Sequence, residues 1–281
     1  MNRVMPLLHP KNPYDGFDSD EWPLDLEGWN STHPLFAELI HQARPARIIE
    51  VGTWKGASAI HMARLVQDTS IAGEIICVDT FLGWPGASVV TRNGYPQLYW
   101  QFLANVIKCK LTELITPFPQ TSELAAEWLG RAQVTADLVY IDGAHGFAAV
   151  YDDLLRYWPL VEAGGYLFGD DYPREGVRRA VDLFSRACGI QVRVVQEKWL
   201  IPKNQDVSGV DPHLHLERHL LGSAASRSQG VARASRASPN TRRSSIRRQN
   251  QDVAGPVGPI SARVSGLVRR HRSGCSHPTA G

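Results

Sequence analysis

Short apolar runs alternate along the middle of the chain with longer stretches whose apolar residues recur at helical spacing. The alternation extends from Arg47 to Lys203, and it is typical of a doubly wound, Rossmann-like α/β sheet. The strands that we expect are 47–52, 75–81, 115–118, 137–141, 166–169, 191–196 and 199–201. The first five are apolar on both faces, as buried central strands must be. The last two have no helix between them, so we expect them to pair antiparallel at the edge.

The stretches with helical periodicity predict helices over 34–43, 57–66, 96–106, 122–129, 147–158 and 175–188. Pro34 suits the first turn of the first helix, and Ser31 or Thr32 is the expected cap. A chain of 281 residues can bury one substantial core and leave part of itself outside it. We therefore expect an N-terminal segment over 1–28 that could cover a substrate, one α/β domain over 29–205 and a tail over 206–281.

The formal net charge of +2 hides an uneven distribution. The tail over 206–281 holds 12 basic and 4 acidic residues, and the first 205 residues hold 18 and 24. The tail contains no Phe, Trp or Tyr, so we expect it to be disordered, because it cannot bury enough apolar surface to offset the entropy of ordering. Its arginine pairs could contact RNA or an anionic membrane, but binders of single strands normally interleave aromatic residues for stacking. A solvated appendage is the better interpretation, with neither nucleic acid nor membrane as a partner.

Cysteine usage and apolar run lengths bear on the compartment. The four cysteines form no C-x-x-C pair and lie far apart, which fits neither a zinc knuckle nor a dense disulfide framework; they are Cys77, Cys109, Cys188 and Cys275. The apolar run at the N-terminus is too short for a signal peptide, and no later run approaches the ~20 apolar residues of a membrane span. The sequence predicts a soluble protein of the reducing cytoplasm.

A turn that contains glycine follows the first expected strand. It reads Glu50-Val-Gly52-Thr-Trp-Lys-Gly56-Ala-Ser58, and glycines in such a turn let the backbone approach a ligand closely. Trp54 stands where the dinucleotide pattern G-x-G-x-x-G has its middle glycine, so a pyrophosphate loses its closest contact and a cofactor without phosphates loses nothing. The second strand ends in Asp79, which can accept hydrogen bonds from both hydroxyls of a ribose. Asp79 alone would suit NAD equally well.

Acids and a histidine follow the fourth and fifth strands, in Asp142-Gly-Ala-His145 and Gly169-Asp170-Asp171-Tyr172. If these strands are neighbours, their ends lie ~5 Å apart and the carboxylates converge. Crowded carboxylates repel one another unless a cation lies among them, and oxygen donors favour Mg²⁺, or Mn²⁺ or Ca²⁺, over zinc. His145 can face the same cleft, and an imidazole is well suited to take a proton from an alcohol near neutral pH. Alternatively, the acids merely cap helices and His145 bonds to backbone.

Taken together, these motifs resemble a family of bacterial enzymes. The segments that carry the resemblance are Glu50 to Ser58, Val78-Asp79-Thr-Phe-Leu-Gly83, Ile141 to His145, and Gly164-Gly165-x-Leu-x-Gly-Asp170-Asp171-Tyr172. Over roughly 29–203 the chain is similar to class I S-adenosylmethionine-dependent methyltransferases of the "methyltransferase 24" group. This group is similar to metal-dependent sugar O-methyltransferases of macrolide biosynthesis, and more distantly to catechol O-methyltransferases.

The resemblance implies a seven-stranded, mostly parallel sheet in the order 3-2-1-4-5-7-6, with helices on both faces and S-adenosylmethionine over the first two strands. Gly52 and Gly56 would border the methionine part, Glu50 would help to hold it, Asp79 would bind the ribose, and the turn ending in Ser122 would lie near the adenine. Asp142, Asp170 and Asp171 would bind Mg²⁺ or Mn²⁺, and His145 would be the base, so that His145 and Asp142 are the expected catalytic residues. Catechol enzymes have Asn where Asp171 stands and commonly use a lysine base, which favours the sugar-modifying branch.

The predicted activity is methyl transfer to a hydroxyl of a small molecule that offers two neighbouring oxygens, such as a sugar or a catechol-like diol. Two alternatives stay open. An NAD-dependent oxidoreductase would share the fold and Asp79, but it would need a pyrophosphate turn. A non-catalytic S-adenosylmethionine-binding protein would not need Asp142 together with His145. The sequence does not identify the acceptor or the metal, and it leaves a homo-oligomer open.

Overall fold

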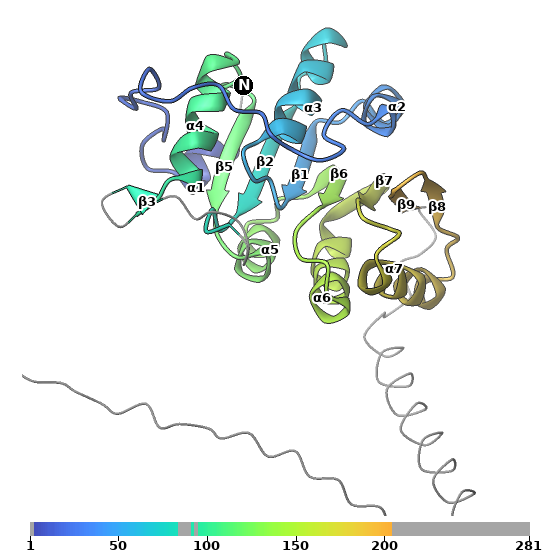
Figure 1. The fold of residues 1–281 in the computed structure, drawn as a ribbon. Coiled ribbons are helices and arrows are strands. Elements are labelled where there is room, and N and C mark those ends of the chain that lie inside the picture. The colour runs from blue at the N-terminus through green and yellow to red at the C-terminus, as the bar shows by residue number, and fades with distance from the viewer. Residues whose placement is uncertain (1–2, 84–90, 93–94, 204–281) are drawn as a thin grey trace, which may run out of the picture. The chain divides into compact units, whose positions relative to one another are not determined.

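The computed structural model describes residues 3–83, 91–92 and 95–203, so the predicted tail lies outside the described residues (Figure 1). The domain is built on a seven-stranded sheet in the order β5-β2-β1-β6-β7-β9-β8. These strands are β5 (Ile115–Pro119), β2 (Glu74–Asp79), β1 (Arg47–Val51), β6 (Ala136–Ile141), β7 (Val161–Gly169), β9 (Lys198–Pro202) and β8 (Arg193–Val195). A small separate pair, β3 (Thr91–Arg92) and β4 (Tyr95–Pro96), precedes β5 in the chain.

The predicted strand order is confirmed, because without the small pair the seven strands follow 3-2-1-4-5-7-6. The first five of these seven strands run parallel to one another. Strand β9 runs antiparallel to both β7 and β8, which confirms the expected edge pair. Strand β7 begins five residues before the predicted strand 166–169. Its first half contains Gly164 and Gly165 and is largely exposed, so no apolar run marked it in the sequence.

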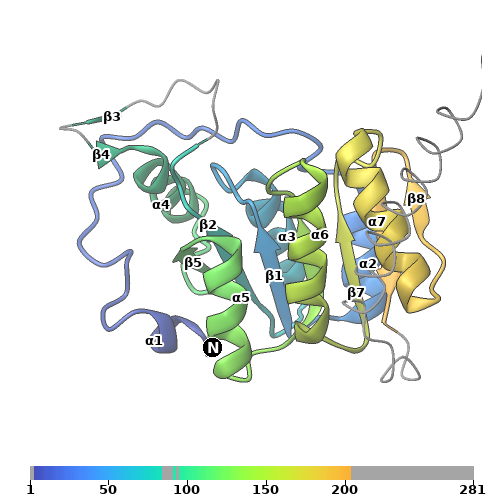
Figure 2. The same ribbon diagram turned by 90° about the horizontal axis from the view of Figure 1, so that it is seen from below.

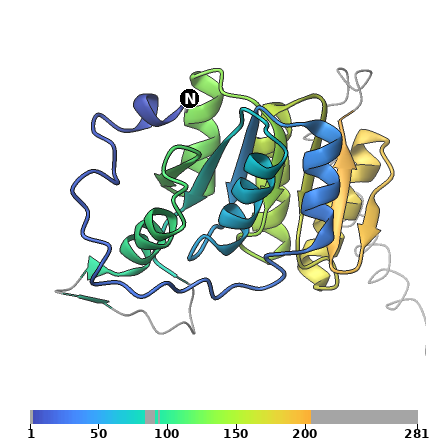
Figure 3. The same cartoon turned by 90° about the horizontal axis from the view of Figure 1, so that it is seen from above.

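Helices cover both faces of the sheet (Figures 2 and 3). One apolar cluster joins the sheet to α2 (Pro34–Ala43), α3 (Ala57–Asp68) and α4 (Leu98–Lys108). The other joins it to α5 (Ser122–Arg131), α6 (Phe147–Tyr157) and α7 (Glu175–Cys188). The remaining helices are α1 (Met5–Leu8) and the 3₁₀ turn η1 (Trp158–Leu160). Among the described residues, no helix has the length and apolar character needed to cross a bilayer.

The start of α2 corrects one prediction. The cap is His33 and not Ser31 or Thr32: its ring Nδ1 accepts from the backbone N–H of Leu35 at 3.1 Å. The residue before a proline is pushed out of helical backbone geometry, and His33, directly before Pro34, is extended with φ −60° and ψ 138°. Its Nε2 lies 2.8 Å from the side-chain oxygen of Gln196, so the cap also ties α2 to the β8–β9 hairpin.

Candidate active site

The two glycines of the turn between β1 and α3 lie where a side chain would have no room. Gly52 and Gly56 have φ of +85° and +86°, a conformation that L side chains rarely adopt. A Cβ on Gly52 would lie 2.2 Å from the carbonyl oxygen of Asp142, and one on Gly56 would lie 2.9 Å from the ring of Phe102. The turn is therefore in direct contact with the end of β6, where the predicted chemical residues begin.

Glu50 lies beneath this turn and is fully buried. Its carboxylate accepts from the hydroxyl of Thr53 at 2.6 Å and from the hydroxyl of Ser58. Burial raises the pKa of Glu50 to about 7, although both hydroxyls lower it. Any influence of Glu50 on a ligand would therefore pass through Thr53, Ser58 and the shape of the turn.

Asp79 ends β2 and faces the same turn. Its Oδ2 accepts from the backbone N–H of Trp54 at 2.9 Å, and its Oδ1 accepts from that of Phe81 at 2.7 Å. Its backbone oxygen accepts from Gln120 N at 3.0 Å, which brings the turn ending in Ser122 to the end of β2. The five residues predicted to hold the cofactor thus lie on or beside β1, β2 and β5.

The structure brings together Asp142, His145 and Asp171. One oxygen or nitrogen from each lies within 4.8 Å of the others, and such a group could hold a metal ion. The cause is the pairing of β6 with β7, in which Ile141 lies opposite Gly169, so that both chains leave the sheet side by side. Asp171 has φ +60°, a left-handed conformation that Asp tolerates better than most residues. His145 Nε2 lies 2.7 Å from Asp171 Oδ2.

The pKa values of Asp142 and Asp171 shift in opposite directions. Burial, followed by repulsion from Asp170, raises the pKa of Asp142 well above its usual range. Burial would also raise the pKa of Asp171, but hydrogen bonds from His145 and Arg174 outweigh it and lower that pKa. An ionised carboxylate only accepts hydrogen bonds, so the hydrogen between His145 Nε2 and Asp171 Oδ2 lies on Nε2, and Nδ1 takes no part in this bond.

Asp170 has a different environment from its two predicted partners. It is buried, and its Oδ2 accepts from the ammonium of Lys198 at 2.9 Å. The same ammonium donates to the hydroxyl of Tyr140 at 2.8 Å, and that hydroxyl donates to Asp142 Oδ2 at 3.0 Å. Neither Lys198 nor Tyr140 is marked by a motif in the sequence. The only signal is a lysine at the head of a short apolar strand, which fits an exposed strand end equally well.

The N-terminal segment runs along the edge of the sheet where the parallel strands end (Figures 2 and 3). Asp25 and Glu27 pair with Lys55 of the glycine turn at 2.7 and 2.6 Å. Further along, the Asn30 side chain donates to Glu197 in the β8–β9 hairpin at 2.5 Å. The segment is thus fixed to both halves of the edge.

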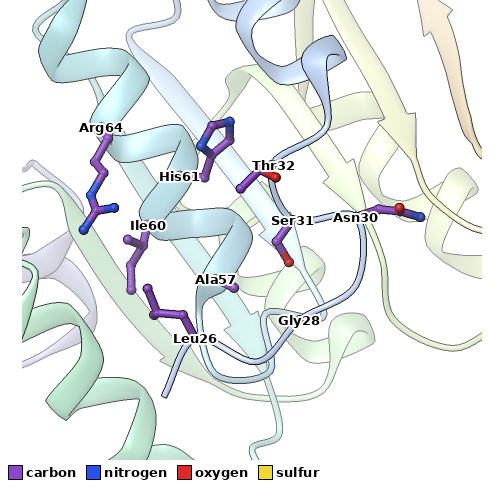
Figure 4. A pocket seen from close by; sticks show the side chains of 9 residues that line it. All are labelled: Leu26, Gly28, Asn30, Ser31, Thr32, Ala57, Ile60, His61 and Arg64. Atoms are coloured by element: carbon purple, nitrogen blue, oxygen red, sulfur yellow. The ribbon is translucent and has the colours of Figure 1, made fainter. Parts of the chain in front are cut away.

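A cavity of about 410 Å³ lies between this segment and α3 (Figure 4). Its lining residues are Leu26, Gly28, Asn30, Ser31, Thr32, Ala57, Ile60, His61 and Arg64. None of them belongs to the acidic group at β6 and β7. The cavity is therefore separate from the chemical residues and borders the glycine turn only through Ala57.

Comparison with known proteins now identifies the domain. Residues 49–172, which run from β1 through the glycine turn to Tyr172, match the family model described as a methyltransferase domain, of the methyltransferase 24 family. Residues 49–172 thus form a methyltransferase domain of this family. This assignment replaces the NAD-dependent alternative.

A curated relative of this chain is the uncharacterized protein y4gI of Sinorhizobium fredii, 27% identical over 154 residues. The match covers 52% of this chain but only 15% of the length of that protein.

The solved structures that are similar in fold include the following three. The O-methyltransferase from Bacillus cereus in complex with SAH has a TM-score of 0.51 at 14% identity, over 72% of this chain and 95% of its own. Cofactor-bound Rv0187 from MTB has 0.51 at 16%, over 67% and 87%. The O-methyltransferase TomG from Streptomyces achromogenes, in complex with SAM, has 0.50 at 15%, over 64% and 82%. At these identities the likeness concerns the fold alone.

Proposed function

We propose that this methyltransferase transfers a methyl group to a hydroxyl oxygen of a small molecule, a sugar or another diol, with the help of a divalent cation. The observation that carries the proposal is the contact between the glycine turn and Asp142, since it puts the cofactor half of the edge directly beside the acidic group. In the transfer, the acceptor oxygen forms a bond to the methyl carbon as the bond from that carbon to sulfur breaks. The sulfonium is already a good leaving group, so the protein's task is alignment and proton removal.

The residues at the ends of β6 and β7 fit a hard divalent cation. Asp171 is favoured in its ionised form, and burial opposes the ionisation of Asp142, a penalty that a cation would relieve. Carboxylate oxygens suit Mg²⁺ or Mn²⁺. Asp142 and Asp171 would hold the ion, whereas Asp170, the third ligand implied by the resemblance, is bonded to Lys198. The ion would supply Lewis acidity toward the acceptor hydroxyl.

His145 is the proposed base. Asp171 accepts from its Nε2, which fixes the ring and leaves Nδ1 to take the acceptor's proton. The His145 ring would then release that proton to water. The N-terminal segment, held by Lys55 and Glu197, is proposed to cover the acceptor and to limit access of water.

We propose that the protein works in the reducing cytoplasm. The three cysteines in the described part of the chain are free thiols, in keeping with a reducing cytoplasm. We propose that the tail over 206–281 is a solvated appendage that the methyltransferase domain does not need.

A protein truncated after Val207 should keep cooperative melting and cofactor binding. Loss of either property would show that the tail belongs to the folded domain.

Calorimetric titration with S-adenosylhomocysteine and NAD, side by side, tests the cofactor pocket. We expect S-adenosylhomocysteine to bind at micromolar level, or about −8 kcal/mol, and NAD to show no heat of binding. The same protein, freed of metal, is then titrated with Mn²⁺ with and without S-adenosylhomocysteine. Failure to bind Mn²⁺ in either state would contradict the metal site but would leave the cofactor assignment standing.

A further inference from the structure

Lys198 is a wholly buried ammonium group, fixed on β9 behind the acidic group. It donates to Asp170 and to the hydroxyl of Tyr140, and it lies 4.8 Å from the ring centres of Phe36 and Tyr140. A buried charge is strongly unfavourable unless it is paired and hydrogen-bonded. Asp170 is the buried acid that meets this requirement, so the pair is a fixed part of the fold.

Two hydrogen-bonded branches connect Lys198 to the acids proposed to hold the cation. One passes through the Tyr140 hydroxyl to Asp142 Oδ2. The other passes through Asp170, whose Oδ1 accepts from the backbone N–H of Asp171 at 2.9 Å. The ammonium therefore fixes the carboxylate of one acid and the backbone of the other.

Arg174 shows why the cations bonded to Asp170 and Asp171 are not equivalent. Its Nε donates to Asp171 Oδ1 at 2.9 Å, but 59% of its side chain is exposed. An exposed guanidinium can swing into water and give up its place to an incoming ion. Lys198 has no exposed side-chain surface and no such freedom. Asp171 can therefore be released to a metal, whereas Asp170 stays paired.

We propose, on the basis of the proposed function, that Lys198 is a positioning residue that neutralises Asp170 permanently and leaves the divalent cation to Asp142 and Asp171. The Asp170–Lys198 pair then contributes no net charge to the site. Two consequences follow. Removing both partners together should leave cation affinity nearly unchanged. Removing the ammonium alone should add one negative charge beside the site and tighten cation binding.

The experiment measures the affinity of the full chain for Mn²⁺ by electron paramagnetic resonance, in the presence of S-adenosylhomocysteine. For Lys198→Met/Asp170→Asn we expect a Kd within about threefold of the wild type, whereas Asp142→Asn should weaken binding by roughly a hundredfold or more. Lys198→Met alone should tighten binding by about tenfold. If the double variant loses Mn²⁺ as Asp142→Asn does, Asp170 is a ligand and the proposal fails. An unchanged Kd in folded Lys198→Met also overturns it.

Lys203 provides a matched control. It is also a lysine beside an aromatic ring, but its ammonium donates to the backbone oxygens of Trp158 and Val161. Lys203→Met should leave the Mn²⁺ affinity unchanged. If Lys198→Met does not fold because Asp170 is left buried without its partner, the double variant still decides, since joint removal of a buried ion pair is often tolerated. A wild type that binds no Mn²⁺ overturns the metal part of the proposed function instead, and with it this role for Lys198.

Discussion

The sheet edge at which the parallel strands end has two halves. The acidic side chains in these two halves accept hydrogen bonds from different kinds of donor. In the half formed by β1 and β2, which we propose binds the cofactor, Glu50 accepts from hydroxyls and Asp79 accepts from backbone N–H groups, all of them neutral donors. In the half formed by β6 and β7, Asp170 is bonded to Lys198, and Asp171 is bonded to His145 and Arg174. Among the hydrogen bonds described, Asp142 is the acid in this half that has neither a lysine nor an arginine partner, and it accepts from the Tyr140 hydroxyl.

This difference supports the proposal that the two halves bind different ligands. Neutral donors orient a carboxyl group without neutralising it, and burial raises the pKa of both Glu50 and Asp79, which suits the proposed hydrogen bonding to ribose hydroxyls better than a fixed negative charge would. Charged donors show that the β6–β7 half holds more negative charge than the fold can leave uncompensated. Part of that compensation is permanent, in Lys198, and part is replaceable, in Arg174. We propose that a divalent cation takes the place of Arg174 beside Asp171.

Replacing the proposed base should give the largest effect on turnover. His145→Ala should bind cofactor and Mn²⁺ normally. Its turnover rate should fall by roughly 10²–10⁴-fold, because no side chain is left to accept the proton of the acceptor hydroxyl. Steady-state rates are measured alongside the two affinities, with His41→Ala as the control, since His41 is an exposed residue whose ring bonds to its own helix at Ala37. A near-normal rate for His145→Ala would move the base to water or to hydroxide.

The cation ligands should give the next largest effect. Asp142→Asn and Asp171→Asn should each weaken Mn²⁺ binding by roughly a hundredfold, and excess Mg²⁺ should restore part of their turnover. Asp137, at the opposite end of β6, accepts from Ala46 N and Arg47 N and serves as the matched control. If Asp137→Asn weakened Mn²⁺ binding as much, the effect would come from the strand and not from the site.

In the cofactor half, Asp79→Ala should weaken S-adenosylmethionine binding by ten- to a hundredfold, or about 1.5–3 kcal/mol, because a bidentate ribose contact is lost. Mn²⁺ affinity should stay as in the wild type, since the two groups rest on different strands. Calorimetry measures both. An unchanged cofactor affinity would remove Asp79 from the ribose site and would break the proposed division of the edge.

Glu50 should give the smallest effect, and it should concern stability. Burial raises its pKa to about 7 in the folded state, above the usual 4.5. The folded state thus binds more protons than the unfolded state between these values, so stability falls as pH rises through this range. The loss attributable to Glu50 between pH 5 and 7 is about 2 kcal/mol. Urea unfolding of the wild type should show this fall, and Glu50→Gln should remove it. Parallel pH profiles for both proteins would contradict the raised pKa.

The sheet could be predicted from the sequence because its five parallel strands are buried on both faces and read as apolar runs. The cap at His33 could not, because it depends on a ring nitrogen reaching Leu35 N, and histidine is not a usual cap residue. Helix ends were predicted to within two residues, as in α3, which ends at Asp68 and not at Val66.

Within the candidate site, the sequence placed Asp142, His145 and Asp171 at neighbouring strand ends, and the structure brings them together. It could not separate Asp170 from Asp171, because the two are adjacent in the chain and differ only in what packs against them. That difference comes from Lys198, 28 residues later and on a strand that returns antiparallel beside β7. Long-range pairing of this kind leaves no local pattern.

The most direct test of cation-dependent methylation is a search for its product. The full chain is incubated with S-adenosylmethionine and an extract of small glycosides, once with Mg²⁺ and once with EDTA after elemental analysis has shown that metal has been removed. Mass spectrometry then looks for compounds that have gained one CH₂ unit. The account predicts such products with Mg²⁺, none with EDTA, and their return when Mg²⁺ or Mn²⁺ is added back. Equal product formation in the metal-free arm would contradict it.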